Sequence, residues 1–385
     1  MKNGRVSTII IVEKIIFCCE RIRKMNSVKK NAAIIGYGGM GGWHQRYFTE
    51  KNSDCVNLLG IWDIKESRRE AAREKGIYVY SSLDEVLADE CVDFIVIATP
   101  NDVHKDIAIA AMKAGKHVVS EKPVTLCSED LEEMIAASNK YGKVFTTHQN
   151  RRWDVDYIMF RDLYRSGKLG MTFTVESRIH GSRGIPGDWR GKKAYGGGMI
   201  LDWGVHLIDQ MLGIIYDKKI KSIYCRCDYI TNAEVDDGFK LELYFEDGIT
   251  AHIEVGTNNF LSMPRFYMTG SSGAAMIGDW KEDCRVVLCT EWSEENVVPV
   301  VTAAGLTKTM APRNSKTTKE ETISRPESDV HDFYRNFTAA IDGREEQLIT
   351  HDQLRRCMKV MEAAFESDRL GRPVDFEDFD APRKN

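Results

Sequence analysis

A glycine-rich turn directly after a short apolar run constrains the fold of this chain most strongly. Residues 32–41 read AAIIGYGGMG, which places Gly36, Gly38 and Gly41 at the spacing G-x-G-x-x-G. This pattern predicts a strand, a tight turn that Gly36 permits, and a helix that packs closely on the strand at Gly41. Gly38 would let a pyrophosphate approach the backbone, at the N-terminus of that helix. The spacing alone is weak evidence, because many glycine-rich loops are only turns.

An acidic residue stands where a dinucleotide site needs one. The next predicted strand, residues 56–63, ends in Asp63, about 20 residues after the last glycine, as expected for the acid that binds the ribose hydroxyls of NAD. Its carboxylate would repel the 2′-phosphate of NADP. Because Lys65, Arg68 and Arg69 follow, NADP is disfavoured and not excluded. The alternative is that Asp63 only caps the next helix.

Strands and helices then alternate as far as residue 150. We expect strands at 91–98, 117–120 and 144–147, separated by helices at 103–114 and 128–141. This order is typical of a doubly wound parallel sheet, so the glycine turn has the context of a Rossmann dinucleotide-binding domain.

Ligands of such sheets bind beyond the carboxyl ends of the strands. Two further strand ends therefore belong to the predicted site: Thr99, Pro100 and Asn101, and then Glu121, Lys122 and Pro123. Lys122, fixed by the following proline, could donate to an alkoxide that develops beside nicotinamide. The alternative is a surface lysine in a turn.

The second half of the chain has another pattern. We expect antiparallel strands over 220–266, with a hairpin turn at 246–248, an exposed loop over 303–328, and helices at 330–341 and 352–369. The predicted fold class is α/β, with an N-terminal Rossmann sheet and a C-terminal α+β domain that contains a large, mostly antiparallel open sheet. The predicted divisions are an N-terminal extension (1–30), a dinucleotide-binding domain (31–150), and a substrate-binding and oligomerisation domain (151–385).

One predicted helix of the second half carries a single polar stripe. Within the apolar segment 199–212, Asp202, His206 and Asp209 lie on one face, and three glycines (196–198) precede it. A buried helix needs polar partners for such a stripe. Asp202 and His206 could pair with each other in the core or ligate a metal, for which no third ligand is evident. We prefer a proton-handling pair, because histidine titrates near neutral pH.

The composition of the chain indicates which kinds of molecule the protein is not expected to bind. The 385 residues carry a net charge of -5, which gives no electrostatic footprint for nucleic acid or an anionic membrane. The ten cysteines include no C-x-x-C pair, so we expect reduced thiols and a cytoplasmic location. The apolar stretch 7–19 is too short and too charged to span a bilayer. We expect an upstream extension that need not belong to the native product; a membrane or partner anchor is the alternative.

These motifs together resemble the glucose–fructose oxidoreductase / inositol dehydrogenase / rhizopine catabolism (Gfo/Idh/MocA) family over roughly residues 31–376. The resemblance lies in the glycine turn, in Ala98-Thr99-Pro100-Asn101 with His104, in Glu121-Lys122-Pro123, and in the three glycines that lead to Asp202 and His206. The segment 149–154 (QNRRWD) resembles the branch that contains scyllo-inositol and related sugar dehydrogenases.

The resemblance implies an NAD-dependent enzyme that oxidises a secondary alcohol of a sugar, glycoside or inositol-like cyclic polyol. Lys122 would hydrogen-bond the substrate oxygen, His206 would move the proton, and Asp202 would hold a neighbouring hydroxyl. The predicted cofactor contacts are Gly36, Tyr37, Gly38, Gly39, Met40, Gly41, Asp63, Thr99, Pro100, Asn101, His104, Glu121, Lys122 and Asn150. The predicted substrate contacts are Arg151, Trp189, Asp202 and His206, the tryptophan lying in a long loop at 181–195 that departs from the family's pattern.

Two other functions stay open at this point. A relative of the same fold can oxidise a sugar transiently with tightly bound NAD, eliminate a substituent and reduce the product again. A nucleotide-sensing regulator would keep the fold without turnover, although a sensor has no need of the pair Lys122 and His206. We expect no metal, and a homodimer or homotetramer formed through the open C-terminal sheet.

Overall fold

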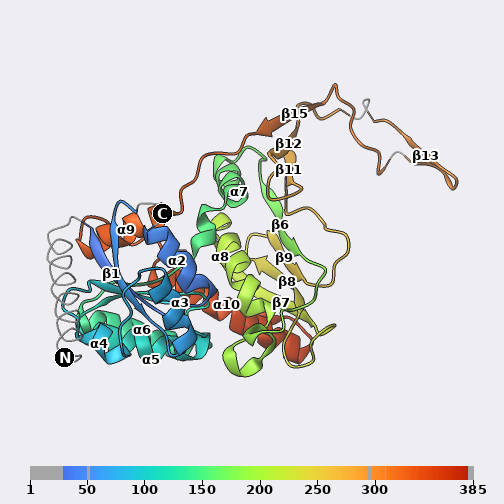
Figure 1. Cartoon of the computed structure of the whole chain (residues 1–385). Helices are drawn as coiled ribbons and strands as arrows, with labels where there is room; N and C mark the ends of the chain where they lie inside the picture. The colour runs from blue at the N-terminus through green and yellow to red at the C-terminus, as the bar shows by residue number, and fades with distance from the viewer. Residues whose placement is uncertain (1–28, 50–52, 294–296, 308, 380–385) are drawn as a thin grey trace, which may run out of the picture. The chain divides into compact units, whose positions relative to one another are not determined.

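The protein is described by a computed structural model that covers residues 29–49, 53–293, 297–307 and 309–379 (Figure 1). All but the last two residues of the predicted N-terminal extension lie outside this range. The described chain forms two compact units: residues 29–149 with 330–355, and residues 150–329 with 356–379.

A five-stranded parallel sheet forms the centre of the first unit. Its strands, in spatial order, are β2 (Val56–Trp62), β1 (Lys30–Ile35), β3 (Phe94–Ile97), β4 (His117–Ser120) and β5 (Phe145–Thr147). A single bridge between Ile61 and Val79 extends it beyond β2. All four residues of β3 are fully buried, as in parallel sheets covered on both faces. The predicted Rossmann fold is confirmed.

The register of this sheet aligns the carboxyl ends of its strands. Ile35 of β1 pairs with Trp62 of β2 and with Ile97 of β3. Ser120 of β4 pairs in turn with Ile97 on one side and with Thr147 of β5 on the other. The residues that follow these strands therefore start from one edge of the sheet, which is where a doubly wound fold binds its ligand.

Helices cover the sheet. They are α2 (Gly39–Thr49), α3 (Glu66–Glu74), α4 (Leu83–Ala88), α5 (His104–Lys113), α6 (Ser128–Tyr141) and α9 (His331–Ile341), with the start of α10 (His351–Leu370). α5 and α6 pack against each other. The chain runs one way from β1 to β2 and the other way from β3 to β5, so right-handed crossovers place α2 and the pair α5 and α6 on opposite faces.

The assignment of α9 to the second domain is wrong. We predicted that everything after residue 150 forms the C-terminal domain, but residues 330–355 belong to the first unit. The reason is aromatic packing: the ring of Tyr334 lies 4.8 Å from that of Phe48 in α2, and Phe337 lies 5.2 Å from Phe94 in β3. These contacts join residues that are 286 and 243 positions apart in the sequence, so no local sequence pattern predicts them.

A nine-stranded sheet dominates the second unit. Its order is β15 (Thr318–Ile323), β12 (Cys284–Cys289), β11 (Gly273–Ile277), β10 (Phe266–Gly270), β6 (Thr172–His180), β9 (Thr250–Gly256), β8 (Gly238–Phe245), β7 (Ile220–Asp228) and β16 (Val374–Asp375). Only β6 and β9 pair in parallel. The predicted large, mostly antiparallel sheet is confirmed, and so is the hairpin between β8 and β9.

Helices and short turns complete this unit. They are a 3-10 turn (Asn150–Trp153), α7 (Val155–Ser166), 3-10 turns at Trp189–Gly191 and Lys193–Tyr195, a π-helical turn (Ile200–Gly204), α8 (Val205–Ile214) and the rest of α10. α7 packs against α8, and α8 contacts β6 and β9. A separate hairpin, β13 (Val300–Thr302) with β14 (Gly305–Thr307), extends away from the nine-stranded sheet (Figure 1).

The expected loop over 303–328 is only partly a loop. Residues 318–323 form β15, an edge strand that pairs with β12 from Cys284–Ile323 to Cys289–Thr318. Its sequence, TKEETI, is polar on nearly every position because edge strands are exposed, so it lacks the apolar alternation of an inner strand.

Among the described residues, no helix has both the length and the apolar character needed to cross a bilayer.

Candidate active site

The glycine turn forms an open cradle at the start of α2. Gly36 has φ +90°, and a Cβ there would lie 2.6 Å from the Ala98 carbonyl oxygen; a Cβ on Gly41 would lie 1.9 Å from the Gly36 oxygen. Both positions therefore require glycine. Beyond Gly38 and Gly39 there is open space. This cradle, beside the first N–H groups of a helix, fits the pyrophosphate of a dinucleotide.

Asp63 ties the end of β2 to this cradle. Its Oδ2 accepts a hydrogen bond of 2.7 Å from the Tyr37 amide, and its Oδ1 accepts one of 2.8 Å from the Lys65 amide. The side chain of Tyr37 is buried, with its hydroxyl 3.0 Å from Gln45 Oε1, so Tyr37 presents its backbone to the cradle. Each carboxylate oxygen has a second lone pair, and Asp63 thus keeps acceptor capacity for a ribose.

The third strand end is held by a buried histidine. Thr99 is half-buried, Pro100 is exposed and Asn101 is buried. His104 is completely buried: its Nε2 lies 3.1 Å from the Thr99 carbonyl oxygen and its Nδ1 lies 3.1 Å from that of Pro123. The ring thus links the strand end after β3 with the strand end after β4. A direct contact of His104 with a cofactor stays a prediction.

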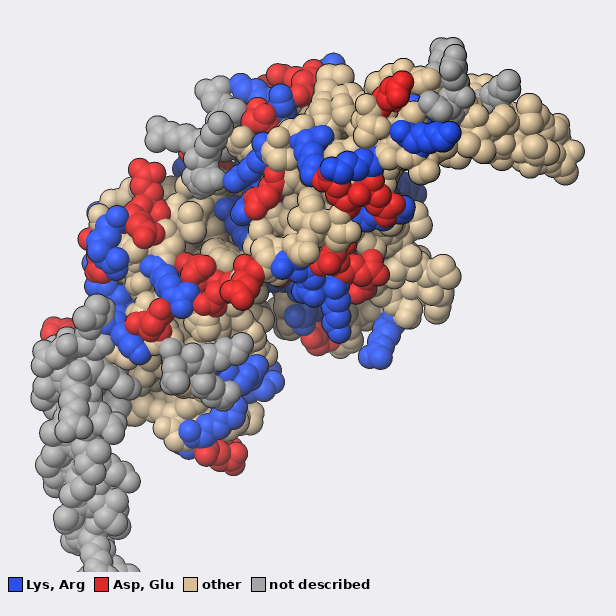
Figure 2. Space-filling view, turned by 90° about the horizontal axis from the view of Figure 1, so that it is seen from above, with Lys and Arg blue, Asp and Glu red and all other residues tan. Residues whose placement is uncertain are grey.

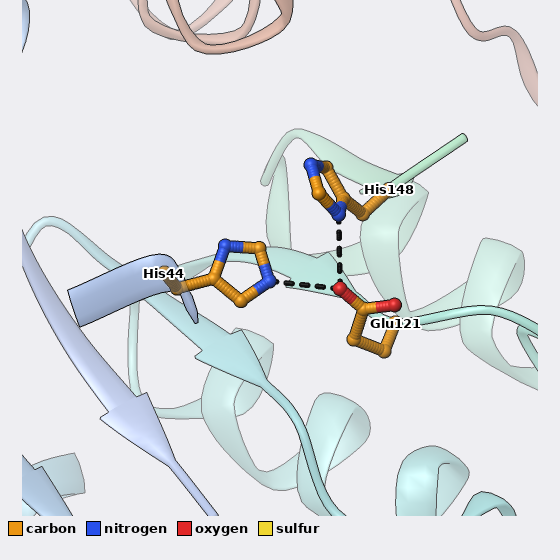
Figure 3. Close-up of side chains that lie close together, drawn as sticks. All are labelled: His44, Glu121 and His148. Carbon is orange, nitrogen blue, oxygen red and sulfur yellow. Dashed lines mark hydrogen bonds and ion pairs between the residues drawn. The ribbon is translucent and has the colours of Figure 1, made fainter. Parts of the chain in front are cut away.

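The strand end after β4 carries the candidate lysine. Lys122 is half-buried, and its peptide bond to Pro123 is cis. The preceding residue, Glu121, is 5% exposed and lies among two histidines: His44 Nε2 is 2.8 Å and His148 Nδ1 is 2.9 Å from the same oxygen, Glu121 Oε1 (Figure 3). On its far side, His44 Nδ1 is 2.7 Å from the hydroxyl of Tyr334.

The charge states in this cluster follow from burial and partners. Burial lowers the pKa of His44 to about 4, although Glu121 opposes the shift, so His44 is neutral at pH 7. Burial would raise the pKa of Glu121, but the charge and hydrogen bond of His148 and the contact with His44 hold it well below its usual range. Burial also raises the pKa of Tyr334. A neutral hydroxyl therefore donates to His44, whose Nε2–H donates to the Glu121 carboxylate.

Metal ligation is a further possibility to weigh for these residues. In the described part of the chain, His44, Glu121 and His148 are side chains of kinds that can bind a metal, and their ligand atoms lie within 4.8 Å of one another. Two zinc bonds of about 2.1 Å at the tetrahedral angle would place the ligand atoms about 3.4 Å apart. The spacings of 2.8 and 2.9 Å match hydrogen bonds instead. That the protein uses no metal stays a prediction.

In the second unit, the predicted polar stripe lies on a π-helical turn and α8. Asp202, His206 and Asp209 are all less than 10% exposed. Arg152 pairs with Asp209 through two bonds of 2.8 and 2.6 Å. Arg190 Nε donates to Asp202 Oδ2 at 3.1 Å, from the loop that we expected to line the sugar site. π-helical turns recur at functional sites.

Aromatic and basic side chains surround this stripe. The Trp203 ring lies 6.1 Å from that of His206, and the Arg151 guanidinium lies over the Trp203 ring, 4.2 Å from its centroid. Trp189 lies under the Arg190 guanidinium at 4.6 Å. All four predicted substrate contacts therefore belong to one unit. Asn150 opens the short turn that carries Arg151.

A buried carboxyl that the sequence reasoning missed holds the start of the π-helical turn. Asp236 Oδ2 accepts a hydrogen bond of 2.8 Å from the Ile200 amide, and a Cβ on Gly198 would lie 2.2 Å from Asp236 Oδ1. The absence of a side chain at Gly198 thus lets this carboxyl approach the helix that carries Asp202. Asp236 stands just ahead of β8, and nothing in its local pattern points to residue 200.

Asp236 should give the protein an unusual pH dependence. Burial raises its pKa from 3.8 to about 7, against the hydrogen bonds from Ile200 and Met199. Between those values the folded protein binds the proton more tightly than the unfolded chain, so this carboxyl lowers the free energy of unfolding as pH rises from about 4 to about 7. We expect Asp236→Asn to flatten that slope in urea titrations at several pH values. An unchanged slope would contradict the assignment.

Comparison with known proteins places the chain among oxidoreductases. Residues 30–149 match the oxidoreductase family with an NAD-binding Rossmann fold, and residues 157–276 match the GFO/IDH/MocA C-terminal domain. The crystal structure of an NAD-binding protein from Listeria innocua is 43% identical, with a TM-score of 0.87 over 90% of this chain and 99% of that one.

Two curated relatives differ in how far the similarity extends. Scyllo-inositol 2-dehydrogenase (NADP(+)) of Bacillus subtilis is 26% identical over 92% of this chain and 98% of its own length. The uncharacterized oxidoreductase C115.03 of Schizosaccharomyces pombe is 36% identical, but the chain spans only 47% of that protein's length.

The parallel sheet with its glycine cradle, the large antiparallel sheet and the matches to both halves agree, and the chain is an NAD-binding oxidoreductase of the Gfo/Idh/MocA family.

Proposed function

We propose that this protein is an NAD-dependent dehydrogenase that oxidises a secondary alcohol of a cyclic polyol, sugar or glycoside to a ketone. The observation that carries the proposal is the buried stripe of Asp202 and His206 in the second unit, with Arg190 on Asp202 and Trp203 beside His206. Several hydrogen-bonding groups beside an aromatic ring suit a polyhydroxylated ring. The relative named scyllo-inositol 2-dehydrogenase supports a cyclic polyol.

The proposed roles divide the chemistry between two residues. NAD, when bound, supplies the hydride acceptor. His206 accepts the proton of the reacting hydroxyl, and Lys122 donates a hydrogen bond to the same oxygen as negative charge develops on it. Asp202 accepts a hydrogen bond from a neighbouring hydroxyl and so orients the ring. Holding the reacting groups in one geometry supplies a large part of the rate.

A spectrophotometric screen tests the proposal. The protein is incubated with NAD and a panel of inositols, aldoses, glycosides and uronates, and absorbance at 340 nm is followed. Net accumulation of NADH supports a dehydrogenase. Consumption of a glycoside without net NADH would instead support the redox-neutral lyase or glycosidase. Binding of NAD with no turnover on any member would favour a nucleotide-sensing regulator.

The choice of cofactor is a separate prediction. Because Asp63 presents a carboxylate at the end of β2, we expect kcat/KM with NAD to exceed that with NADP by about tenfold or more. Arg69, which donates to the Asp63 carbonyl oxygen at 2.8 Å, is the nearest basic group on the following helix. The relative from Bacillus subtilis carries NADP(+) in its name, so a strong preference for NADP would overturn the use of Asp63.

We also propose that the protein forms a homodimer or homotetramer through the second unit. Phe173 in β6 is 46% exposed, and Val301 and Leu306 of the β13–β14 hairpin are 75% and 60% exposed. Exposed apolar side chains on strands favour association. We expect light scattering to give a multiple of the 43.8 kDa chain mass and Val301→Asp with Leu306→Asp to lower it. A monomer at micromolar concentration would contradict this proposal.

The remaining expectations concern partners and location. The face in Figure 2 has basic and acidic side chains interspersed, which favours neither nucleic acid nor an anionic membrane as a partner. We retain a small polyhydroxylated molecule as the proposed ligand and the cytoplasm as the proposed location.

A further inference from the structure

Lys122 lies in a segment that is otherwise buried. In residues 118–125, all of which the structure describes, every residue but Lys122 is buried. Ser120 and Glu121 start from the sheet, where the Glu121 amide donates to the Ile97 carbonyl oxygen at 2.9 Å. The lysine is thus a half-buried residue on a backbone whose neighbours on both sides are buried.

Before Lys122, the segment is anchored by Glu121, which lies between the buried side chains of His44 and His148. Glu121 Oε1 accepts from both His44 and His148, while its Oε2 lies 3.3 Å from the Lys122 amide nitrogen. One carboxylate therefore connects two histidines to the backbone of the lysine itself. The alignment of the strand ends explains the contact, because Glu121 follows β4 and His148 follows β5, and Ser120 pairs with Thr147.

This cluster is closed off from water. His44 and His148 are fully buried, and the His148 ring packs against Phe333 at 4.8 Å and Trp43 at 5.3 Å. Within the described part of the chain, His148 Nε2 has no hydrogen-bond partner. An unsatisfied buried group of this kind costs about 1–3 kcal/mol. What the histidine supplies in return is its Nδ1 contact with Glu121 at 2.9 Å, which a phenylalanine at this position could not make.

The anchor after the lysine is His104. Its Nδ1 lies 3.1 Å and 3.3 Å from the carbonyl oxygens of Pro123 and Val124, and the ring is fully buried. Hydrogen bonds from buried side chains to backbone on both sides of one residue restrict the backbone conformation at that residue.

We propose that the buried cluster of His44, Glu121, His148 and Tyr334 is a positioning device for Lys122, which fixes the backbone from which the lysine reaches the reacting oxygen. The inference rests on the proposed function, because it assumes that Lys122 takes part in turnover. Glu121, predicted from the sequence as a cofactor contact, thereby acts on the site through the lysine. The four members are positioning residues and do not touch the substrate.

The first test needs no substrate. Hydrogen exchange of amides 118–125, measured by mass spectrometry on the full chain, reports how firmly the segment is held. We expect Glu121→Gln to speed exchange there by about tenfold or more. Tyr334→Phe, which removes one hydroxyl at the far end of the cluster, should have a smaller effect in the same segment. The matched control is Tyr80→Phe, which removes a buried hydroxyl bound to Asp89 at 2.7 Å and should leave the segment unchanged. Unchanged exchange in Glu121→Gln would overturn the proposal.

A double-mutant cycle then tests whether the cluster acts through the lysine. With the most active alcohol of the screen, we expect Glu121→Gln to lower kcat about 10–100-fold in the wild-type background and less than about twofold in the Lys122→Ala background. NADH affinity, measured by fluorescence titration, should change less than about twofold. Equal effects in both backgrounds would overturn the inference. If Lys122→Ala itself keeps wild-type kcat, the proposed function fails instead, and the two failures are thereby distinguished.

His148→Phe separates positioning from folding. It removes one donor to the buried Glu121 carboxylate together with the unsatisfied Nε2, two changes with opposite effects on stability, so the informative readout is kcat, which we expect to fall in protein whose circular dichroism matches the wild type at the assay temperature. A merely structural histidine would change the melting temperature and leave kcat unchanged. This variant also covers the case in which Glu121→Gln does not fold.

Discussion

Lys122→Ala and His206→Ala should each lower kcat by about 10²–10⁴-fold, the range for removing a group that handles a proton or stabilises developing charge. Lys122 is the half-buried member of a buried segment, and His206 is a buried residue of α8, so the fold of each variant has to be checked alongside its activity. The measurement is steady-state kinetics with the most active alcohol, accompanied by circular dichroism to confirm the fold.

The matched control for the lysine is Lys105→Ala, on the helix after the third strand end. Lys105 pairs with Asp130 at 2.6 Å on the surface of the same unit, so its removal should leave kcat within about twofold. If Lys122→Ala and His206→Ala both kept wild-type turnover, the assignment of the reacting groups would be wrong.

The largest expected effect on stability comes from a buried ion pair in the second unit. Arg265 Nε lies 3.0 Å from Asp156 Oδ2, and both side chains are at most 3% exposed. Burial lowers the pKa of Arg265 to about 10, although the charge of Asp156 opposes the shift. Arg265, the residue just before β10, also donates to Gln210 at 2.9 Å in α8, the helix that carries His206.

Removing the arginine leaves the Asp156 carboxylate buried without its partner. We expect Arg265→Ala to lower the free energy of unfolding by about 3–5 kcal/mol. The control Arg285→Ala breaks an exposed pair with Glu320, and the expected loss is much smaller because solvent screens that pair. Urea unfolding followed by circular dichroism measures both. If the free energy of unfolding fell equally in the two variants, the buried ion pair of Arg265 would stabilise this unit no more than an exposed pair, and the prediction would be wrong.

The parts of the fold that depend on residues close together in the sequence could be predicted from local sequence patterns. The glycine turn could be recognised because a Cβ at Gly36 or Gly41 meets backbone atoms, so only glycine is tolerated there. The apolar run of β3 and the alternation of β8 and β9 likewise follow from burial on two faces or on one. The edge strand β15 could not be found in this way, because its side chains stay exposed.

Contacts between residues that are far apart in the sequence could not be predicted from such patterns. Glu121 was identified only as part of a strand end, while its partners His44 and His148 lie 77 and 27 positions away. Tyr334 completes the cluster from a helix that we had assigned to the other domain. Asp236, which caps the turn before Asp202, lies 36 positions from the amide that it accepts. Each of these contacts depends on how elements far apart in the sequence pack together, and local sequence patterns carry no information about that packing.

The central claim is that the protein transfers a hydride from a carbinol carbon to NAD and releases NADH. The most direct measurement uses the most active alcohol of the screen, prepared with deuterium on its carbinol carbons, and mass spectrometry of the NADH that is released. We predict one deuterium in each NADH, with one ketone formed per NADH. Conversion of the alcohol without deuterated NADH in solution, or NAD binding with no conversion at all, would contradict the claim.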